Sequence, residues 1–350
     1  MFQVQFLQSW FMFWNFILEV PTGVVADYFG RKKSVMLGLI FFGIGILIYG
    51  IIPSFYMFLL CEFILALGVS LMSGADKALF FDSLKEIGEE KESKKLFGKA
   101  HSWKLIALLV SAPIGSLIGS KVGLNIPMLL STISIFIAFL FISRFKEPKQ
   151  YEREDEGKRY FQIFTQGIKF VKNNDFIRRL SLNGILINSA GYFIIWLYQP
   201  MLSKLDIPII YFGYFHALLV LVQVIVSSNF GFFEKKFGFN NYLKFSSIMV
   251  LGFFLLVVLM PNIFTAILLI VFAGGFGLTH LEFVYAHLNE NIPSNMRATI
   301  LSTVGLFSSL FLFVVNPIVG FLADRSVILA FGIISLLPMV SLAFKTRKQS

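Results

Sequence analysis

Apolar runs of about 20 residues recur from one end of this sequence to the other, with short polar segments between them. A helix of about 20 residues crosses the ~30 Å hydrocarbon core of a bilayer. Because every backbone N–H and C=O must be paired internally in lipid, repeated runs of this kind predict a bundle of transmembrane helices. The sequence therefore predicts an all-α, polytopic membrane protein. The predicted spans are 4–26, 34–52, 55–79, 101–120, 124–143, 177–200, 208–230, 243–260, 263–286, 298–322 and 327–344.

Composition agrees with a membrane protein and excludes several other classes. Charged residues make up 14% of the chain, whereas soluble globular domains have about 25%. The net charge of +10 does not indicate a nucleic-acid partner, because the basic residues lie in loops between the spans and form no binding motif. The single cysteine, Cys61, lies in an apolar run and predicts neither a disulfide nor a metal site. No P-loop, HExxH or GxSxG pattern is present, so we expect no enzyme, no ATP-driven pump and no cofactor.

The distribution of lysine and arginine predicts the orientation. Basic residues concentrate in alternate loops, at 31–33, 85–99, 144–179, 235–236, 297 and 345–348. The opposite loops hold only Lys121, Lys204 and Arg325. Because basic loops remain cytoplasmic, we expect these alternate loops and the C-terminus in the cytoplasm, with the protein in the cell membrane.

An internal repeat predicts two similar halves. Gly23 and Gly30 recur 208 residues later as Gly231 and Gly238, and Pro113 recurs 204 residues later as Pro317. Parallel repeats of this kind are typical of two-lobed transporters. We predict an N-terminal transmembrane half at 1–143, a linker at 144–176 and a C-terminal half at 177–350. The first half has five spans and the second has six, so eleven helices are seen where twelve are expected, and the missing one is the first.

The linker begins with a charged stretch, RFKEPKQYEREDEGKR, and continues with apolar residues at helical spacing from Tyr160 to Val171. This pattern predicts an amphipathic helix. The helix either lies at the cytoplasmic membrane interface or packs against the ends of the bundle.

The stretch EVPTGVVADYFGRKK, which starts at Glu19, interrupts the apolar sequence between the first two spans. It resembles the G-x-x-x-D-x-x-G-R-K/R signature between the second and third helices of the major facilitator superfamily. EVPTG and the later SGADKALFFDSLKEIGEE (Ser73 to Glu90) are similar to a prokaryotic branch assigned mostly to drug or small-metabolite transport. The resemblance implies a two-lobed bundle that moves a small molecule across the lipid bilayer by alternating access. We expect a monomer.

The signature predicts a gate built from Gly23, Asp27, Gly30, Arg31, Lys32 and Asp82. Gly23 leaves a smooth helix surface that a neighbouring backbone can approach closely, and Gly30 permits the tight turn. Asp27 lies near the C-terminus of its helix, where the helix dipole disfavours an anion. The resemblance implies that its partner is the N-terminus of the helix beginning near Thr299, and Arg31 could pair with Asp82. Alternatively, these charges only set topology and cap helix ends.

Ionisable residues inside spans are costly and usually face a cavity or a partner. Glu19 shares a helix face with Gly23 and Asp27, so it either extends the gate or binds a proton. Glu62 is either a proton carrier or a member of a structural pair. His280 and Glu282 follow the glycine cluster AGGFG, and they either contact substrate or protons or are polar residues near the cytoplasmic end.

Other polar residues within spans have similar alternatives. Asn188 and Tyr192, followed by Trp196 and Gln199, have helical spacing along one span, and Gln223 lies in the next. These side chains either line a cavity or form hydrogen bonds between helices.

The sequence thus predicts a secondary active transporter, with proton-coupled efflux of a drug or metabolite as the first interpretation. The alternatives are a nutrient symporter or uniporter, and a non-transporting membrane sensor or remnant. The segment SAPIGSLIG matches the antiporter signature of the family poorly, so the direction of transport stays open.

Overall fold

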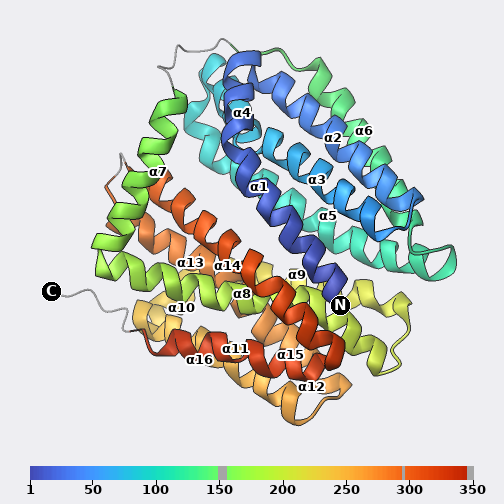
Figure 1. Cartoon of the computed structure of the whole chain (residues 1–350). Helices are drawn as coiled ribbons and strands as arrows, with labels where there is room; N and C mark the ends of the chain where they lie inside the picture. Colours follow the sequence, from blue (N-terminus) through green and yellow to red (C-terminus); the bar gives the residue numbers. More distant parts are fainter. Residues whose placement is uncertain (149–155, 294–295, 345–350) are drawn as a thin grey trace. The chain divides into compact units, whose positions relative to one another are not determined.

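The computed structural model describes residues 1–148, 156–293 and 296–344, and each regular element in that part of the chain is a helix (Figure 1). The predicted all-α fold is therefore confirmed. The first elements are α1 (Phe2–Phe29), α2 (Arg31–Ile51), α3 (Phe55–Met72), α4 (Ala75–Glu86), η1 (Glu90–Glu92), α5 (Ser93–Lys121), α6 (Ile126–Arg144) and α7 (Glu156–Asn173). They are followed by α8 (Asp175–Lys204), η2 (Ile209–Tyr211), α9 (Phe212–Ser228), α10 (Phe230–Phe237), α11 (Phe239–Leu259), α12 (Ile263–Leu268), η3 (Leu269–Gly274), α13 (Gly275–Asn291), α14 (Arg297–Arg325), α15 (Val327–Ile334) and α16 (Leu336–Leu342).

Nine helices in the described part of the chain are long and apolar enough to cross a membrane. They are Arg31–Ile51, Phe55–Glu86, Lys95–Lys121, Ile126–Arg144, Asp175–Lys204, Ile209–Ser228, Phe239–Leu259, Ile263–Asn291 and Thr299–Arg325. The two other predicted spans coincide with α1 and with the shorter apolar stretch Val327–Leu342. The helices therefore lie where the apolar runs predict them.

Two of the membrane-length spans are not continuous α-helices. The helix that begins at Phe55 breaks at Ser73 and Gly74, where Gly74 has a φ of +75°, and then continues as α4. The span that begins at Ile263 contains a π-helical turn, η3, at residues 269–274. A π turn is often found where a helix serves a function.

The chain divides into two compact units. Unit 1 comprises residues 1–2, 107–117 and 163–350, and unit 2 comprises residues 3–106 and 118–162. Unit 2 thus contains α2, α3, α4 and α6, and unit 1 contains α8 to α16.

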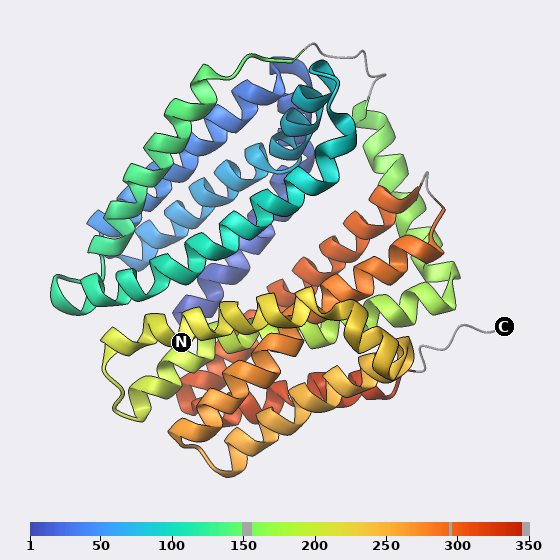
Figure 2. The same ribbon diagram turned by 180° about the vertical axis from the view of Figure 1, so that it is seen from behind.

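Within unit 2, α2 packs against both α3 and α6 (Figures 1 and 2). Gly38 on α2 and Gly68 on α3 allow the first of these contacts. A Cβ added to Gly38 would lie 2.7 Å from the carbonyl oxygen of Gly68, and one added to Gly68 would lie 2.8 Å from the backbone nitrogen of Phe42. The two backbones touch directly, which is how helices associate closely in lipid.

Within unit 1, α8 is the most enclosed span, because 67% of its most apolar window is buried. It packs against α13, α14, α15 and α16. Phe193, Leu197 and Tyr198 on α8 are among the largest fully buried side chains of the described chain. The C-terminal helices of this unit are therefore assembled around α8.

The second part of α7 packs against α14 within unit 1. Gly167 and Val171 are buried, and a Cβ on Gly167 would contact the side chains of Thr299 and Thr303. Lys169 and Lys172 on the same helix are exposed. Residues 165–173 thus have the apolar and polar faces that the sequence predicts.

Candidate functional site

The turn between α1 and α2 consists of Gly30 alone. Gly30 has φ +98° and ψ 148°, and it accepts a backbone hydrogen bond of 3.1 Å from Ser34. Positive φ is easily adopted only by glycine. A Cβ at this position would also lie 3.1 Å from the carboxylate of Glu147. The glycine therefore permits both the turn and the approach of an acidic side chain.

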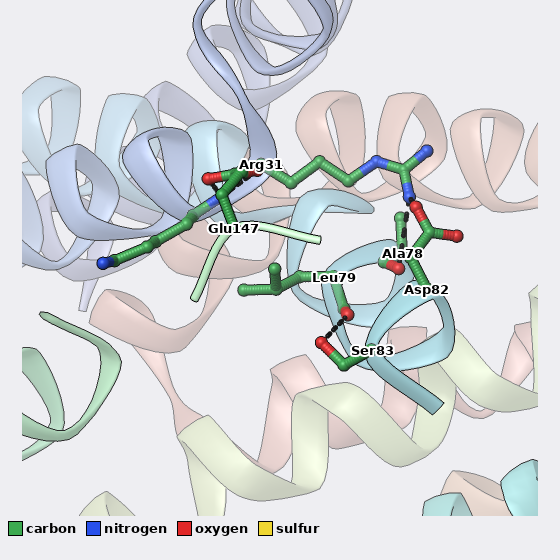
Figure 3. Close-up of polar contacts among 7 residues, drawn as sticks. Arg31, Ala78, Leu79, Asp82, Ser83 and Glu147 are labelled. Carbon is green, nitrogen blue, oxygen red and sulfur yellow. Dashed lines mark hydrogen bonds and ion pairs between the residues drawn. The ribbon is translucent and has the colours of Figure 1, made fainter. Parts of the chain in front are cut away.

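Arg31, the first residue of α2, reaches across to α4 (Figure 3). Its guanidinium donates to the carboxylate of Asp82 and, at 3.2 Å, to the carbonyl oxygen of Ala78. The side chains of Arg31 and Asp82 are 12% and 17% exposed. The structure thus brings together the two residues that the sequence suggested as a pair, in a largely water-excluded contact.

Glu147, which lies near Arg31 in Figure 3, caps the start of α2, and Lys32 caps the end of α6. The carboxylate oxygens of Glu147 lie 3.1 and 3.2 Å from the backbone N–H of Lys32, in the first turn of α2. In return, the Lys32 ammonium donates to the carbonyl oxygen of Ser143, 2.8 Å away in the last turn of α6. Each side chain satisfies a backbone group that a helix end leaves unpaired, and each has the charge that the helix dipole favours there.

The sequence interpretation missed Glu147. A signal for it exists: α2 begins with Arg31, Lys32 and Lys33, has no acidic residue in its first turn, and has a glycine in place of a capping side chain. Such a helix N-terminus needs an anion from elsewhere in the chain. Glu147 follows α6, the helix packed beside α2, and supplies that anion.

Two other residues of the signature lie on α1. A Cβ added to Gly23 would meet no heavy atom of unit 2 within 4 Å, so no other helix of this unit approaches α1 closely at that glycine. Asp27 lies in the last turn of α1, and its side chain is outside the described part of the structure. Its gating role stays a prediction.

The two acidic candidates within unit 2 differ in environment. Glu62 on α3 is 5% exposed, and the hydroxyl of Tyr49 on α2 interacts with its carboxyl group. The Tyr49 ring stacks on Phe58 with centroids 4.3 Å apart. Glu19 on α1 is only half-buried. Of these two candidates, Glu62 is therefore the one that unit 2 encloses together with a polar partner.

His280 joins helices inside unit 1. The fully buried ring lies with Nε2 2.8 Å from Oδ1 of Asn183 on α8 and Nδ1 2.6 Å from Oγ of Ser246 on α11. Asn183 donates its amide to the carbonyl oxygen of Ser341 on α16 at 3.2 Å, so Oδ1 is the atom that faces the histidine. Because Oδ1 only accepts, Nε2 carries the hydrogen toward Asn183, while the Ser246 hydroxyl lies between Nδ1 and the carbonyl oxygen of Leu243, 3.1 Å away. This network ties four helices together, and a substrate or proton role for His280 stays a prediction.

The remaining candidates in unit 1 lie on the less buried sides of their helices. Asn188 and Tyr192 on α8 are half-buried, and the Tyr192 and Trp196 rings have centroids 6.3 Å apart. Gln223 on α9 donates to the carbonyl oxygen of Leu219 on its own helix at 3.3 Å. Glu282 is exposed, in contrast to His280 two residues earlier. The environments of these candidates therefore range from half-buried to exposed.

An open cavity of about 420 Å³ lies at the junction of α7 and α8, apart from these candidates. Its lining residues are Gln166, Lys169, Phe170, Asn173, Asn174 and Met296. Among the residues that the structure describes, no group of three or more histidine, cysteine or acidic side chains is arranged to hold a metal ion.

The family model of the Major Facilitator Superfamily matches residues 1–314. The chain belongs to this superfamily. The match spans both units and includes the loop with Gly30, Arg31 and Lys32. The chain is therefore a multi-pass membrane protein of a transporter family, and it is not an enzyme.

Known members of the superfamily show similarity over most of their length. The uncharacterized MFS-type transporter YxaM of Bacillus subtilis (strain 168) is 27% identical over 82% of this chain and 72% of its own length. BacE of Bacillus amyloliquefaciens, named as a candidate bacilysin exporter, is 23% identical over 88% of this chain and 77% of its own. The crystal structure of the nucleoside transporter NupG has a TM-score of 0.76 at 15% identity, covering 99% of this chain and 91% of that one. The likeness to NupG concerns the fold alone.

Proposed function

We propose that this superfamily member is a secondary active transporter that exports a small amphipathic drug or metabolite in exchange for protons. The observation that carries the proposal is the family match over residues 1–314. The sequence similarity to BacE supports export, and bacilysin is the first solute to test. We place the protein in the cell membrane as a monomer, with the C-terminus in the cytoplasm.

The contacts at the start of α2 support a mechanism in which unit 2 moves as one body. Arg31 joins α2 to α4, while Lys32 and Glu147 join α2 to the end of α6. A rigid unit is what alternating access by rocking requires. In the proposal, Asp27 contacts the N-terminus of α14 to close the cytoplasmic side, and the contact breaks when the units rock.

Glu62 is the proposed proton carrier. It is an ionisable side chain inside a span, buried within unit 2 and adjacent to Tyr49. Residues of this type inside membrane helices commonly take part in proton relays. Tyr49 supplies a hydroxyl that can remain hydrogen-bonded to the carboxyl group in either protonation state.

Transport into inside-out membrane vesicles tests the proposal. Energised vesicles that contain the protein should accumulate bacilysin or a cationic amphiphile, and a protonophore should abolish the accumulation. Glu62→Gln should abolish it as well while the protein level is unchanged. Accumulation that persists in the presence of the protonophore would exclude proton coupling. Loss of solute from preloaded vesicles would mean that the protein transports the solute in the opposite direction, into the cell. Flux equal to that of protein-free vesicles for every solute would contradict the proposal.

A further inference from the structure

The cavity between α7 and α8 lies at a turn of a single residue. The helix α7 ends at Asn173 and α8 begins at Asp175, so Asn174 alone joins them (Figures 1 and 2). The side-chain oxygen of Asn174 accepts the backbone N–H of Ile177 at 3.1 Å and caps α8. This cap does not use the amide nitrogen of Asn174, so the side chain can still donate a hydrogen bond at the cavity wall.

The lining of the cavity combines hydrogen-bond donors with apolar side chains. Lys169 contributes an ammonium group, which can only donate, and Gln166 and Asn173 contribute carboxamides. Phe170 and Met296, both half-buried, contribute apolar surface. Among the described residues that line the cavity, none is acidic. Such a lining favours a ligand that has an anionic group next to an apolar part.

The charge around the cavity is positive. Residues 165–179 contain four basic residues and one acidic residue, which gives this segment a net charge of +3. The acidic residue, Asp175, binds the guanidinium groups of both Arg178 and Arg179, so its charge is already compensated. The positive end of the α8 dipole lies at the same turn. Together these charges attract an anion to the cavity.

The position of the cavity along the span indicates where that anion comes from. The membrane-length span α8 begins at Asp175, so the cavity lies at the end of a span, at the level of the lipid headgroups. Gly167 and Val171 on α7 are buried, whereas Lys169 and Lys172 are exposed, and a helix with these two faces is typical of the membrane interface. The cavity of about 420 Å³ is within the range of about 300–1,000 Å³ found for small-molecule sites.

We propose that this cavity binds the phosphate headgroup of an anionic phospholipid. The Lys169 ammonium pairs with the phosphate, and the carboxamides of Asn173 and Asn174 donate to its oxygens. The glycerol part of the lipid contacts Phe170 and Met296. A lipid bound there joins the second part of α7 to the starts of α8 and α14, and therefore stabilises unit 1. This binding does not depend on which solute the protein transports, or on whether it transports one.

Thermal unfolding of the purified full chain in detergent, titrated with short-chain phosphatidylglycerol, tests the site. The lipid should raise the Tm of the wild type by several degrees in a saturable way. Phosphatidylcholine with the same acyl chains, and inorganic phosphate, should have little effect at equal concentrations. Lys169→Gln should need about fivefold more phosphatidylglycerol for the half-maximal shift, which is the loss expected for one basic residue at an anionic lipid. Its Tm without lipid should equal that of the wild type, because Lys169 is exposed.

Lys235→Gln is the matched control, because it removes the same charge from an exposed position on α10, outside the cavity. Its half-maximal lipid concentration should equal that of the wild type, and Lys169→Arg, which keeps the charge, should also bind like the wild type. Equal half-maximal concentrations for Lys169→Gln and the wild type would overturn the proposal, as would an equal shift with phosphatidylcholine. An equal shift with inorganic phosphate that depends on Lys169 would mean that the ligand is a free phosphate-type anion, which would contradict a lipid site.

Discussion

Arg31 and Asp82 each lie at a helix position that would be unfavourable without the other. Arg31 is the first residue of α2, where the positive end of the helix dipole repels a cation, and Asp82 lies near the C-terminus of α4, where the negative end repels an anion. Their contact compensates both positions. Because the pair is largely shielded from water, removing one partner leaves a charge without compensation.

We expect Arg31→Ala and Asp82→Ala each to lower the free energy of unfolding by about 3 kcal/mol. The double variant should lose much less than the combined loss of the two single variants, because both changes remove the same contact. Thermal or SDS-induced unfolding in micelles measures these values. Lys33→Ala, at an exposed position two residues away, is the control and should have little effect. Additive losses would show that the two side chains do not stabilise each other.

Glu147 acts as the N-terminal cap of α2, so Glu147→Ala should lower the free energy of unfolding by about 1 kcal/mol. Lys146→Ala provides the comparison, because Lys146 is adjacent and exposed. Thermal unfolding of the two variants under the same conditions decides the point. Equal melting temperatures would mean that the contact with the Lys32 backbone contributes nothing to stability.

Sequence reasoning reached Arg31 and Asp82 because both belong to recognisable motifs of the superfamily. It did not reach Glu147, which lies 115 residues from Lys32 and belongs to a charged linker that looks uniformly solvated. The hydrogen bonds of His280 could likewise not be predicted, because its partners Asn183 and Ser246 lie on two other helices. A hydrogen-bond network of this kind depends on three-dimensional packing, and spacing along one helix does not reveal it.

At the scale of helices, the glycines of α2 and α3 control how closely the two helices pack. Gly68→Ala should lower the Tm by several degrees, since its Cβ would lie 2.8 Å from backbone atoms that cannot move separately. Gly252→Ala on α11 is the matched control, because a Cβ there would meet no atom within 4 Å. It should leave the Tm unchanged or raise it slightly, since alanine favours a helix. A Tm for Gly68→Ala equal to that of Gly252→Ala would show that the close approach is not needed.

The helix positions could be predicted because a bilayer allows few alternatives for an apolar run of about 20 residues. The interruptions within these helices could not be predicted from the sequence. The π turn at residues 269–274 includes the start of the glycine cluster AGGFG, but no sequence rule specifies its hydrogen-bond pattern. Similarly, the sequence predicts a span that ends at residue 230 and then a loop, where the structure has the short helix α10.

At the scale of the whole molecule, the two units have corresponding loops that are held by different polar contacts. Each has a loop between two spans that starts α2 or α11 after a glycine of positive φ, Gly30 or Gly238. The loop of unit 2 is held by the ion pair between Arg31 and Asp82 and by the contacts of Lys32 and Glu147 with helix ends. The loop of unit 1 is held by Glu234 on α10, whose Oε1 lies 2.9 Å from Nε2 of His287 on α13.

Flux through the reconstituted protein with and without the Asp27 carboxylate tests the central claim most directly. Purified wild type and Asp27→Asn are placed in liposomes at equal protein amounts, and uptake of bacilysin or of the best solute from the vesicle screen is followed under a pH gradient. The account predicts wild-type flux above that of empty liposomes and a reduction of about tenfold in Asp27→Asn, with normal insertion and accumulation of the variant. Flux in Asp27→Asn equal to that of the wild type would contradict the gating role of the loop, and the absence of wild-type flux would contradict transport itself.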